Sequence, residues 1–432
     1  MGLYDNINVM ENNGIKQVYA SVFIEESGIQ VVCSEYFNTR FNVIFQDKFP
    51  IEGLFDYKVL DFNKFSLSIK LALDKASTKI GATINKVILI LPPFQFKAFE
   101  INVNVVPENG IIEKGDIAKA LSDSLKSTVS NDLIIANAYI KKYTINGIES
   151  RKNPIGERCN DFFCSIDLLC CDKELAYNYI KAINVSGYDV LDITLNNYSI
   201  AKETLLLEKS VKENIILIDI GYTHTYLTHL INGTIHSSEI IHSGIYTFVA
   251  DAVNSFKFKQ DNIVDLIKYN DFDYQNPNDV VYAWTNEDGV NCTITFEQLF
   301  NSFKNNLDLF VNNIYSMCKP IFENSKTSFY ITGEGADMVA LVKSLKDVLP
   351  YEIKTYVPDE IGVRDPSLSA IFGSFNIYKE KADLNNINVS CIDLYEYNNC
   401  VDIDSKRNVN DGVSITASIK KMFKNYLSKE DK

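Results

Sequence analysis

Two short runs of apolar residues most constrain the fold of this chain. The first, Lys86–Leu91, is stopped by two consecutive prolines, and the second, Asn214–Ile220, contains a single charged residue, Asp219. Uninterrupted apolar runs of this length are typical of strands buried between helical layers. Each run lies in a half of the chain that also carries a β-hairpin, a helix and a further strand. The sequence therefore predicts a duplicated α/β body with a nucleotide-sized cleft between its halves.

The first half opens with a hairpin pattern and is then interrupted. Residues 17–32 contain two alternating strands joined across residues 25–28, and residues 61–80 place their apolar side chains on one helical face. Residues 94–169 instead alternate short strands around one amphipathic helix at 114–126. This change of pattern predicts a small inserted α+β subdomain.

The second half repeats the order of hairpin, helix and strand. Asn232-Gly233 separates two alternating strands, and this pair favours a two-residue turn because both residues tolerate positive φ. A long helix is predicted at residues 296–318. The strand at residues 328–332 ends at Gly333-Glu334-Gly335, and a helix is expected at 336–349.

The charge balance excludes one class of function. The 432 residues include 56 acidic and 42 basic side chains, which gives a net charge of -14. A general nucleic-acid-binding protein needs a basic surface, so no nucleic-acid partner is expected. Contact with an anionic membrane surface would have to come from a local basic segment.

The cysteine pattern and the absence of export signals indicate a reducing compartment. The nine cysteines include no C-x-x-C pair and no disulfide framework. We expect no signal peptide and no transmembrane segment, because no apolar run reaches the about 20 residues that span a bilayer. Cys164, Cys170 and Cys171 are predicted to be core residues of a strand. The sequence thus predicts a cytoplasmic protein.

Three motifs resemble those of one family. Residues 217–224, Leu-Ile-Asp-Ile-Gly-Tyr-Thr-His, are similar to a second phosphate loop, D-I-G-G-G-T. Residues 330–336, Tyr-Ile-Thr-Gly-Glu-Gly-Ala, are similar to an adenosine loop, T-G-G-G-A, and residues 152–156 match K-N-P-x-G in an extra subdomain. Together they resemble the bacterial cell-division protein FtsA family. That family has a duplicated actin-like (ribonuclease H-like) fold of the actin/Hsp70/sugar-kinase class.

The resemblance implies ATP and Mg²⁺ as ligands. Glycines let backbone N–H groups approach phosphate oxygens, and an acidic residue holds Mg²⁺, usually through water. The implied nucleotide-binding residues are Asp219, Gly221, Tyr222, Thr223, Gly333, Glu334, Gly335 and Ala336.

Departures from the family pattern predict a degenerate nucleotide site. Tyr222 and Thr223 stand where the family has two glycines, so Tyr222 is expected to block or reshape the phosphate position. In the first phosphate loop, Glu25 and Glu26 replace the usual pattern and would repel a triphosphate in a cleft of low dielectric. We therefore expect little or no ATP hydrolysis and no catalytic residue.

All four histidines fall between residues 224 and 242. Across a two-residue turn at Asn232-Gly233, His229 and His236 are predicted to lie opposite each other. Two histidines without a carboxylate or cysteine make a poor zinc site. The expectation is a plain cross-strand pair, and no metal ligand is assigned.

The C-terminal segment has the pattern of an amphipathic membrane helix. Apolar side chains recur at helical spacing, lysines occupy the other side, and a polar stretch precedes them. Such a helix lies in the membrane interface, although a helix packed on the body is the alternative. The predicted membrane-binding residues are Ile415, Ile419, Lys420, Lys421, Met422, Phe423, Lys424, Tyr426 and Leu427.

The resemblance implies an adaptor that tethers FtsZ filaments to the inner face of the cell membrane at the division site, where it self-associates into filaments of the Z ring. The FtsZ tail is expected near Ser302 and Lys304, although the family's E-P-R sequence is replaced there by Phe300-Asn301-Ser302. The alternatives are an active ATPase of kinase or chaperone type and a PilM-like pilus adaptor.

The same resemblance predicts the division of the chain into subdomains. They are a first body at 1–93 and 170–210, an insertion at 94–169, a second body at 211–245 and 328–378, a helical subdomain at 246–327, a flexible linker at 379–411 and a membrane helix at 412–428.

Overall fold

A computed structural model describes the chain from residue 17 to residue 399, apart from residues 38, 257–259, 271–275, 286–288, 324, 361–363 and 388. The predicted membrane helix and the end of the predicted linker lie outside these residues.

The first body is built on a five-stranded sheet with the order β3-β2-β1-β6-β11. The first three strands are antiparallel, whereas β6 and β11 run parallel to β1. Its strands are β1 (Gln17–Glu25), β2 (Gly28–Phe37), β3 (Arg40–Phe49), β6 (Lys86–Leu91) and β11 (Asp189–Leu195). The accompanying elements are β4 (Leu54–Phe55), β5 (Lys58–Val59), α1 (Phe62–Ile80), α3 (Lys173–Val185), α4 (Asn196–Glu203) and α5 (Leu206–Lys209).

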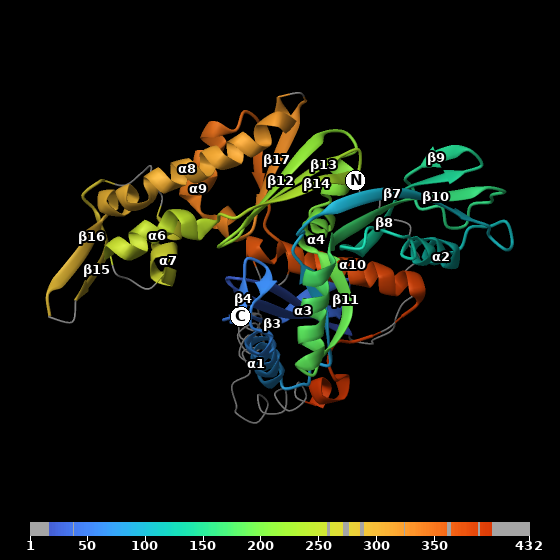
Figure 1. Ribbon diagram of the computed structural model, residues 1–432, viewed down its shortest axis with the longest axis horizontal. Coiled ribbons are helices and arrows are strands. Elements are labelled where there is room, and N and C mark those ends of the chain that lie inside the picture. Colours follow the sequence, from blue (N-terminus) through green and yellow to red (C-terminus); the bar gives the residue numbers. More distant parts are fainter. Residues whose placement is uncertain are drawn as a thin grey trace, which may run out of the picture.

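The second body repeats this topology, with the order β14-β13-β12-β17-β18 and the same change from antiparallel to parallel pairing. The repeated order confirms the predicted duplication (Figure 1). Its strands are β12 (Asn214–Ile220), β13 (Thr225–Ile231), β14 (Thr234–Ile241), β17 (Thr327–Thr332) and β18 (Ile353–Thr355). Its helices are α6 (Ile245–Phe256), α7 (Gln260–Tyr269), α8 (Phe296–Phe322), α9 (Val339–Val348) and the short η1 (Glu334–Asp337) and η2 (Pro366–Leu368).

The apolar run of β12 is explained by burial on both faces of its sheet. Ile215 and Leu217 pack into the core of the first body, whereas Ile216 and Ile218 pack into a second core with α6, α8 and α9. Successive strand residues point to opposite faces, so a strand between two cores needs apolar residues at every position.

A small hairpin, β15 (Val280–Thr285) and β16 (Asn291–Thr295), precedes α8.

The inserted subdomain forms its own sheet, with the order β7-β10-β8-β9. Helix α2 (Lys114–Ser124) covers this sheet and shares a separate small core with it. Cys164 lies in this core, and Cys170 and Cys171 are also buried on β10, as predicted. In Figure 1 the insertion projects on the side opposite to β15 and β16. Its strands are β7 (Lys97–Val105), β8 (Leu133–Ile145), β9 (Ile148–Ser150) and β10 (Phe162–Asp172).

Helix α10 (Ser369–Asn385) corrects two of the predicted boundaries. Its residues 370–378 are buried in the core of the first body, not the second, and the helix continues beyond residue 379. The chain then packs on the first body, where Cys391 N–H donates a hydrogen bond to the Val18 carbonyl (2.8 Å). The prediction of a flexible linker that starts at residue 379 is therefore wrong, because Cys391 and Tyr397 are buried and this segment packs on the first body.

The β13–β14 hairpin differs in register from the prediction. Asn232 and Gly233 adopt the expected positive φ values of 56° and 76°. However, a bulge between His229 and Leu230 pairs His229 with Ser237 rather than with His236. The two imidazole rings still meet edge to face, with their centroids 5.4 Å apart.

Among the described helices, none is long and apolar enough to cross a lipid bilayer.

Candidate nucleotide site between the two bodies

Strands β1, β12 and β17 end around a small cavity between the two bodies. Its volume is about 20 Å³, which corresponds to about one water molecule. Four of the eight predicted nucleotide-binding residues line it: Asp219, Gly221, Gly333 and Glu334. The rest of the lining is Phe23, Glu25, Gly28, Gln30, Lys48, Asn196, Ile200, Pro366, Ser367, Ser369 and Ala370.

Asp219 is held by protein groups at the end of β12. Its side chain is buried and accepts a hydrogen bond from Asn196 Nδ2 (2.7 Å). Burial raises the pKa of this carboxyl group to about 6. Gly333 approaches it so closely that any side chain there would collide with Asp219 Oδ1, and its φ of 83° independently favours glycine.

The predicted phosphate loop, residues 221–224, forms a tight turn in which Gly221 N–H donates to the His224 carbonyl (2.9 Å). The Tyr222 ring packs against Tyr246, with centroids 5.8 Å apart, and against the second core. Tyr222 is not among the residues that line the cavity. Thr223 Oγ1 lies 2.9 Å from Nδ1 of His224.

The adenosine-loop residues make contacts within the protein. Glu334 forms an ion pair with Lys48 of β3, so this pair joins the two bodies beside the cavity. A side chain at Gly335 would collide with Ile220, and Ala336 is buried in the second core. Both residues thus support the end of β12 and do not line the cavity.

The two glutamates of the first hairpin also accept hydrogen bonds from other residues of the protein. Glu25 lines the cavity and accepts a hydrogen bond from the Tyr226 hydroxyl (3.0 Å). Burial raises its pKa to about 7. Glu26 accepts a hydrogen bond from the backbone N–H of Asp56.

These observations bear on whether a nucleotide fits. The cavity has room for about one water molecule, the ion-paired Lys48 and Glu334 line it, and the Glu25 carboxyl group lies in its wall. Desolvating a triphosphate beside a carboxylate is costly. In this arrangement the residues do not accommodate ATP with Mg²⁺.

Sequence reasoning missed several cavity residues, and three of them show how the fold brings separate elements together. Lys48 comes from the edge strand β3, Asn196 from the start of α4, and Ser369 from α10. None belongs to a motif. The one available signal is the position of Asn196 directly after a strand, where polar side chains gather at a sheet edge.

The other predicted sites lie away from the cavity. Ser302 and Lys304 are on α8, where Ser302 Oγ donates to the Leu299 carbonyl (2.6 Å) and Lys304 pairs with Asp308 (2.7 Å). Residues 152–156 form a loop of the inserted subdomain, and neighbouring Arg151 donates to the Asn232 carbonyl of the second body (2.9 Å). The nine predicted membrane-binding residues, 415–427, lie outside the described residues.

The two repeated sheets and their helices form an actin-like fold. A solved structure of a PilM-PilN type IV pilus biogenesis complex matches with a TM-score of 0.54 and 12% sequence identity, covering 83% of this chain and 98% of that chain. A likeness of this size shows the fold alone. No protein-family model matches the sequence.

The curated relatives that match this sequence include cell division proteins. Cell division protein FtsA of Bacillus subtilis is 22% identical over 367 residues, which is 83% of this chain and 82% of the relative. FtsA of Enterococcus hirae is 22% identical over 369 residues, which is 81% of this chain and 80% of the relative. The chain is therefore similar in sequence to FtsA over most of its length, as its three motifs predicted.

Proposed function

We propose that the chain is a cell-division adaptor that tethers FtsZ filaments to the cytoplasmic membrane. The observation that carries this proposal is the likeness to FtsA, which covers 83% of the chain. The residues 152–156, which match the family's K-N-P-x-G element, lie in the inserted subdomain and add support from the sequence.

The C-terminal segment is the proposed membrane anchor. Its lysines supply local positive charge on a chain with a net charge of -14. Each lysine near an anionic lipid surface contributes about 1 kcal/mol, and the apolar face adds burial in the interface. This anchor would keep the protein on the inner face of the membrane.

The helical subdomain is the proposed docking surface for the FtsZ tail. Helix α8 presents Lys304, which lies over the Phe300 ring at 5.7 Å and pairs with Asp308. A cation beside a partly buried aromatic ring suits an acidic and apolar peptide. We also propose that the actin-like body self-associates into filaments.

The nucleotide site is proposed to be degenerate, with ATP and Mg²⁺ weakly bound or absent and with little or no hydrolysis. The protein contacts that occupy Asp219 and Glu334 support this proposal. An active ATPase of kinase or chaperone type needs an open phosphate site, which these contacts disfavour.

A vesicle flotation experiment with the full chain tests the tether. FtsZ polymers should float with vesicles of phosphatidylglycerol and phosphatidylcholine only when the chain is present. A variant with Ile419→Asp and Phe423→Asp, which charges the apolar face, should reduce FtsZ recovery at least tenfold.

The matched control carries the same added charge on the other face, with Ser414→Asp and Asn425→Asp. Helical spacing places these two positions away from Ile419 and Phe423, so recovery should fall clearly less than in the apolar-face variant. Equal losses for the two variants would contradict an apolar anchor. If the chain floats with the vesicles but FtsZ polymers do not float with it, the tether is contradicted.

A further inference from the structure

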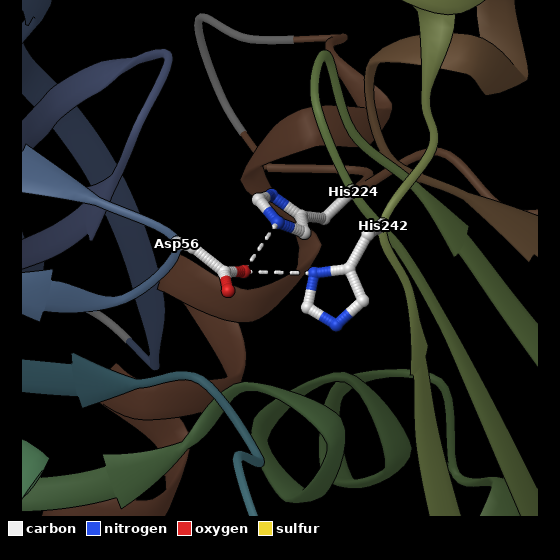
Figure 2. Close-up of side chains that lie close together, drawn as sticks. All are labelled: Asp56, His224 and His242. Atoms are coloured by element: carbon white, nitrogen blue, oxygen red, sulfur yellow. Dashed lines mark ion pairs between the residues drawn. The ribbon is translucent and has the colours of Figure 1, made fainter.

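Three side chains from the two bodies converge next to the cavity. Asp56 lies in the turn between β4 and β5 of the first body, whereas His224 and His242 belong to the second body (Figure 2). Asp56 Oδ1 is 2.9 Å from His242 Nδ1 and 3.9 Å from a nitrogen of His224, Nε2. All three ligand atoms lie within 4.8 Å of one another, and no other such group occurs among the residues that the structure describes.

The backbone holds Asp56 in this position. Asp56 and Tyr57 form a two-residue turn with φ values of 47° and 61°, a strained conformation for a residue as bulky as tyrosine. Tyr57 is buried, its hydroxyl group lies 2.7 Å from that of Tyr226, and its ring packs on His224 at 4.6 Å. The first body thus fixes the aspartate directly against the histidines.

The spacing of the atoms suits a tetrahedral metal ion. Bonds of ~2.0–2.2 Å in such a site place neighbouring ligand atoms ~3.3 Å apart, and the distances of 2.9 and 3.9 Å bracket this value. A small inward movement of His224 would complete the arrangement.

The second ring nitrogen of His224 is already positioned as in metal sites. A metal-binding histidine commonly bonds through one nitrogen and hydrogen-bonds through the other. Here the Thr223 hydroxyl lies 2.9 Å from Nδ1, so Nε2 faces Asp56.

We propose that Asp56, His224 and His242 bind a divalent transition-metal ion, most favourably Zn²⁺, and that the ion links the two bodies across the cleft. One carboxylate and two imidazoles form a ligand set that suits Zn²⁺ and leaves a fourth position for water. The His242 side chain is 55% exposed, so an ion can enter from solvent. This site is independent of the proposed tethering function.

Metal titration of the full chain, stripped with a chelator, tests the site. Co²⁺ should give the visible absorption band of a tetrahedral complex, Zn²⁺ should displace it, and Zn²⁺ should raise the melting temperature because it binds only the folded state. His242→Ala and Asp56→Asn should each weaken Zn²⁺ binding at least tenfold. Asparagine tolerates the left-handed conformation at position 56.

The other histidine pair supplies the control. His236→Ala removes a ring that packs on His229 without any carboxylate ligand, so Zn²⁺ affinity should stay within twofold of wild type. Circular dichroism confirms that each variant is folded. The proposal is overturned if wild-type protein gives no Co²⁺ band, or if His242→Ala and His236→Ala bind Zn²⁺ equally.

Discussion

At the scale of a single residue, Glu203 at the end of α4 is a partly buried carboxyl group that joins three segments. It accepts hydrogen bonds from the Tyr356 hydroxyl and from Asn376 Nδ2, both at 2.8 Å. Burial raises its pKa to about 7. Tyr356 follows the last strand of the second body and Asn376 lies on α10, so this carboxyl group sits between the two bodies.

The raised pKa predicts a dependence of stability on pH. Between about pH 4.5 and 7 the folded state keeps a proton that the unfolded state has released, so stability falls as pH rises from about 4.5 to 7 and levels off above 7. Glu203→Gln removes this loss. The variant should unfold with a free energy about 1–3 kcal/mol above wild type at pH 8 and close to wild type at pH 4.5.

Urea unfolding at the two pH values measures this effect. Glu208→Gln changes an exposed carboxyl group on the neighbouring α5 and should alter stability by less than about 0.5 kcal/mol at both. If the difference in unfolding free energy between Glu203→Gln and wild type is the same at pH 4.5 and pH 8, titration of Glu203 does not cause the pH dependence.

At the scale of elements, the contact between α10 and α4 depends on Gly373. A Cβ atom at this position would collide with the backbone of Ser199. Backbone cannot move aside as a flexible side chain can, so Gly373→Ala should destabilise the fold by about 3 kcal/mol or more. The free energy of unfolding in urea checks this prediction.

Gly115 on α2 provides the matched control, because a Cβ atom there would meet nothing within 4 Å. Gly115→Ala should therefore stabilise the protein slightly, by up to about 1 kcal/mol, through the loss of backbone freedom in the unfolded chain. Similar effects of the two substitutions would contradict close packing at Gly373.

The elements that were predictable are those set by local pattern. A few adjacent residues determine the apolar strand β12 and the Asn232-Gly233 turn, and both form as expected. The partner of α10 was not predictable, because the N-terminal part of this helix is buried on nearly all sides and has no polar face to orient it. The bulge that shifts His236 likewise leaves no local signal.

At the scale of the whole molecule, the candidate site was predictable only where motifs mark it. Asp219 and Gly333 lie at strand ends in recognisable loops, whereas Lys48 and Asn196 reach the cavity through the packing of separate elements. The metal-site cluster is a stronger case, since Asp56 lies 168 positions from His224 in sequence (224 minus 56) and further still from His242. The spacing of residues along the chain does not indicate that Asp56 contacts these histidines in the folded protein.

The closure of the cleft leads to the last prediction. The Lys48–Glu334 pair and the hydroxyl contact between Tyr57 and Tyr226 join the bodies around a cavity of about 20 Å³. A nucleotide could enter only if these contacts broke, and that free-energy cost would reduce its apparent affinity. Calorimetric titration of ATP with Mg²⁺ into the full chain should therefore give no detectable heat, and ATP should leave the melting temperature unchanged.

A nucleotide-binding actin-like protein measured in the same buffer serves as the positive control. Micromolar ATP binding by this chain, lost in Asp219→Ala but kept in Asp365→Ala, would contradict the degenerate site. Asp365 accepts a hydrogen bond from Ser367 N–H (2.9 Å) near the cavity but is not part of its lining. The comparison thus separates ligation at Asp219 from the general loss of a carboxylate beside the cleft, because both variants remove one negative charge from the same region.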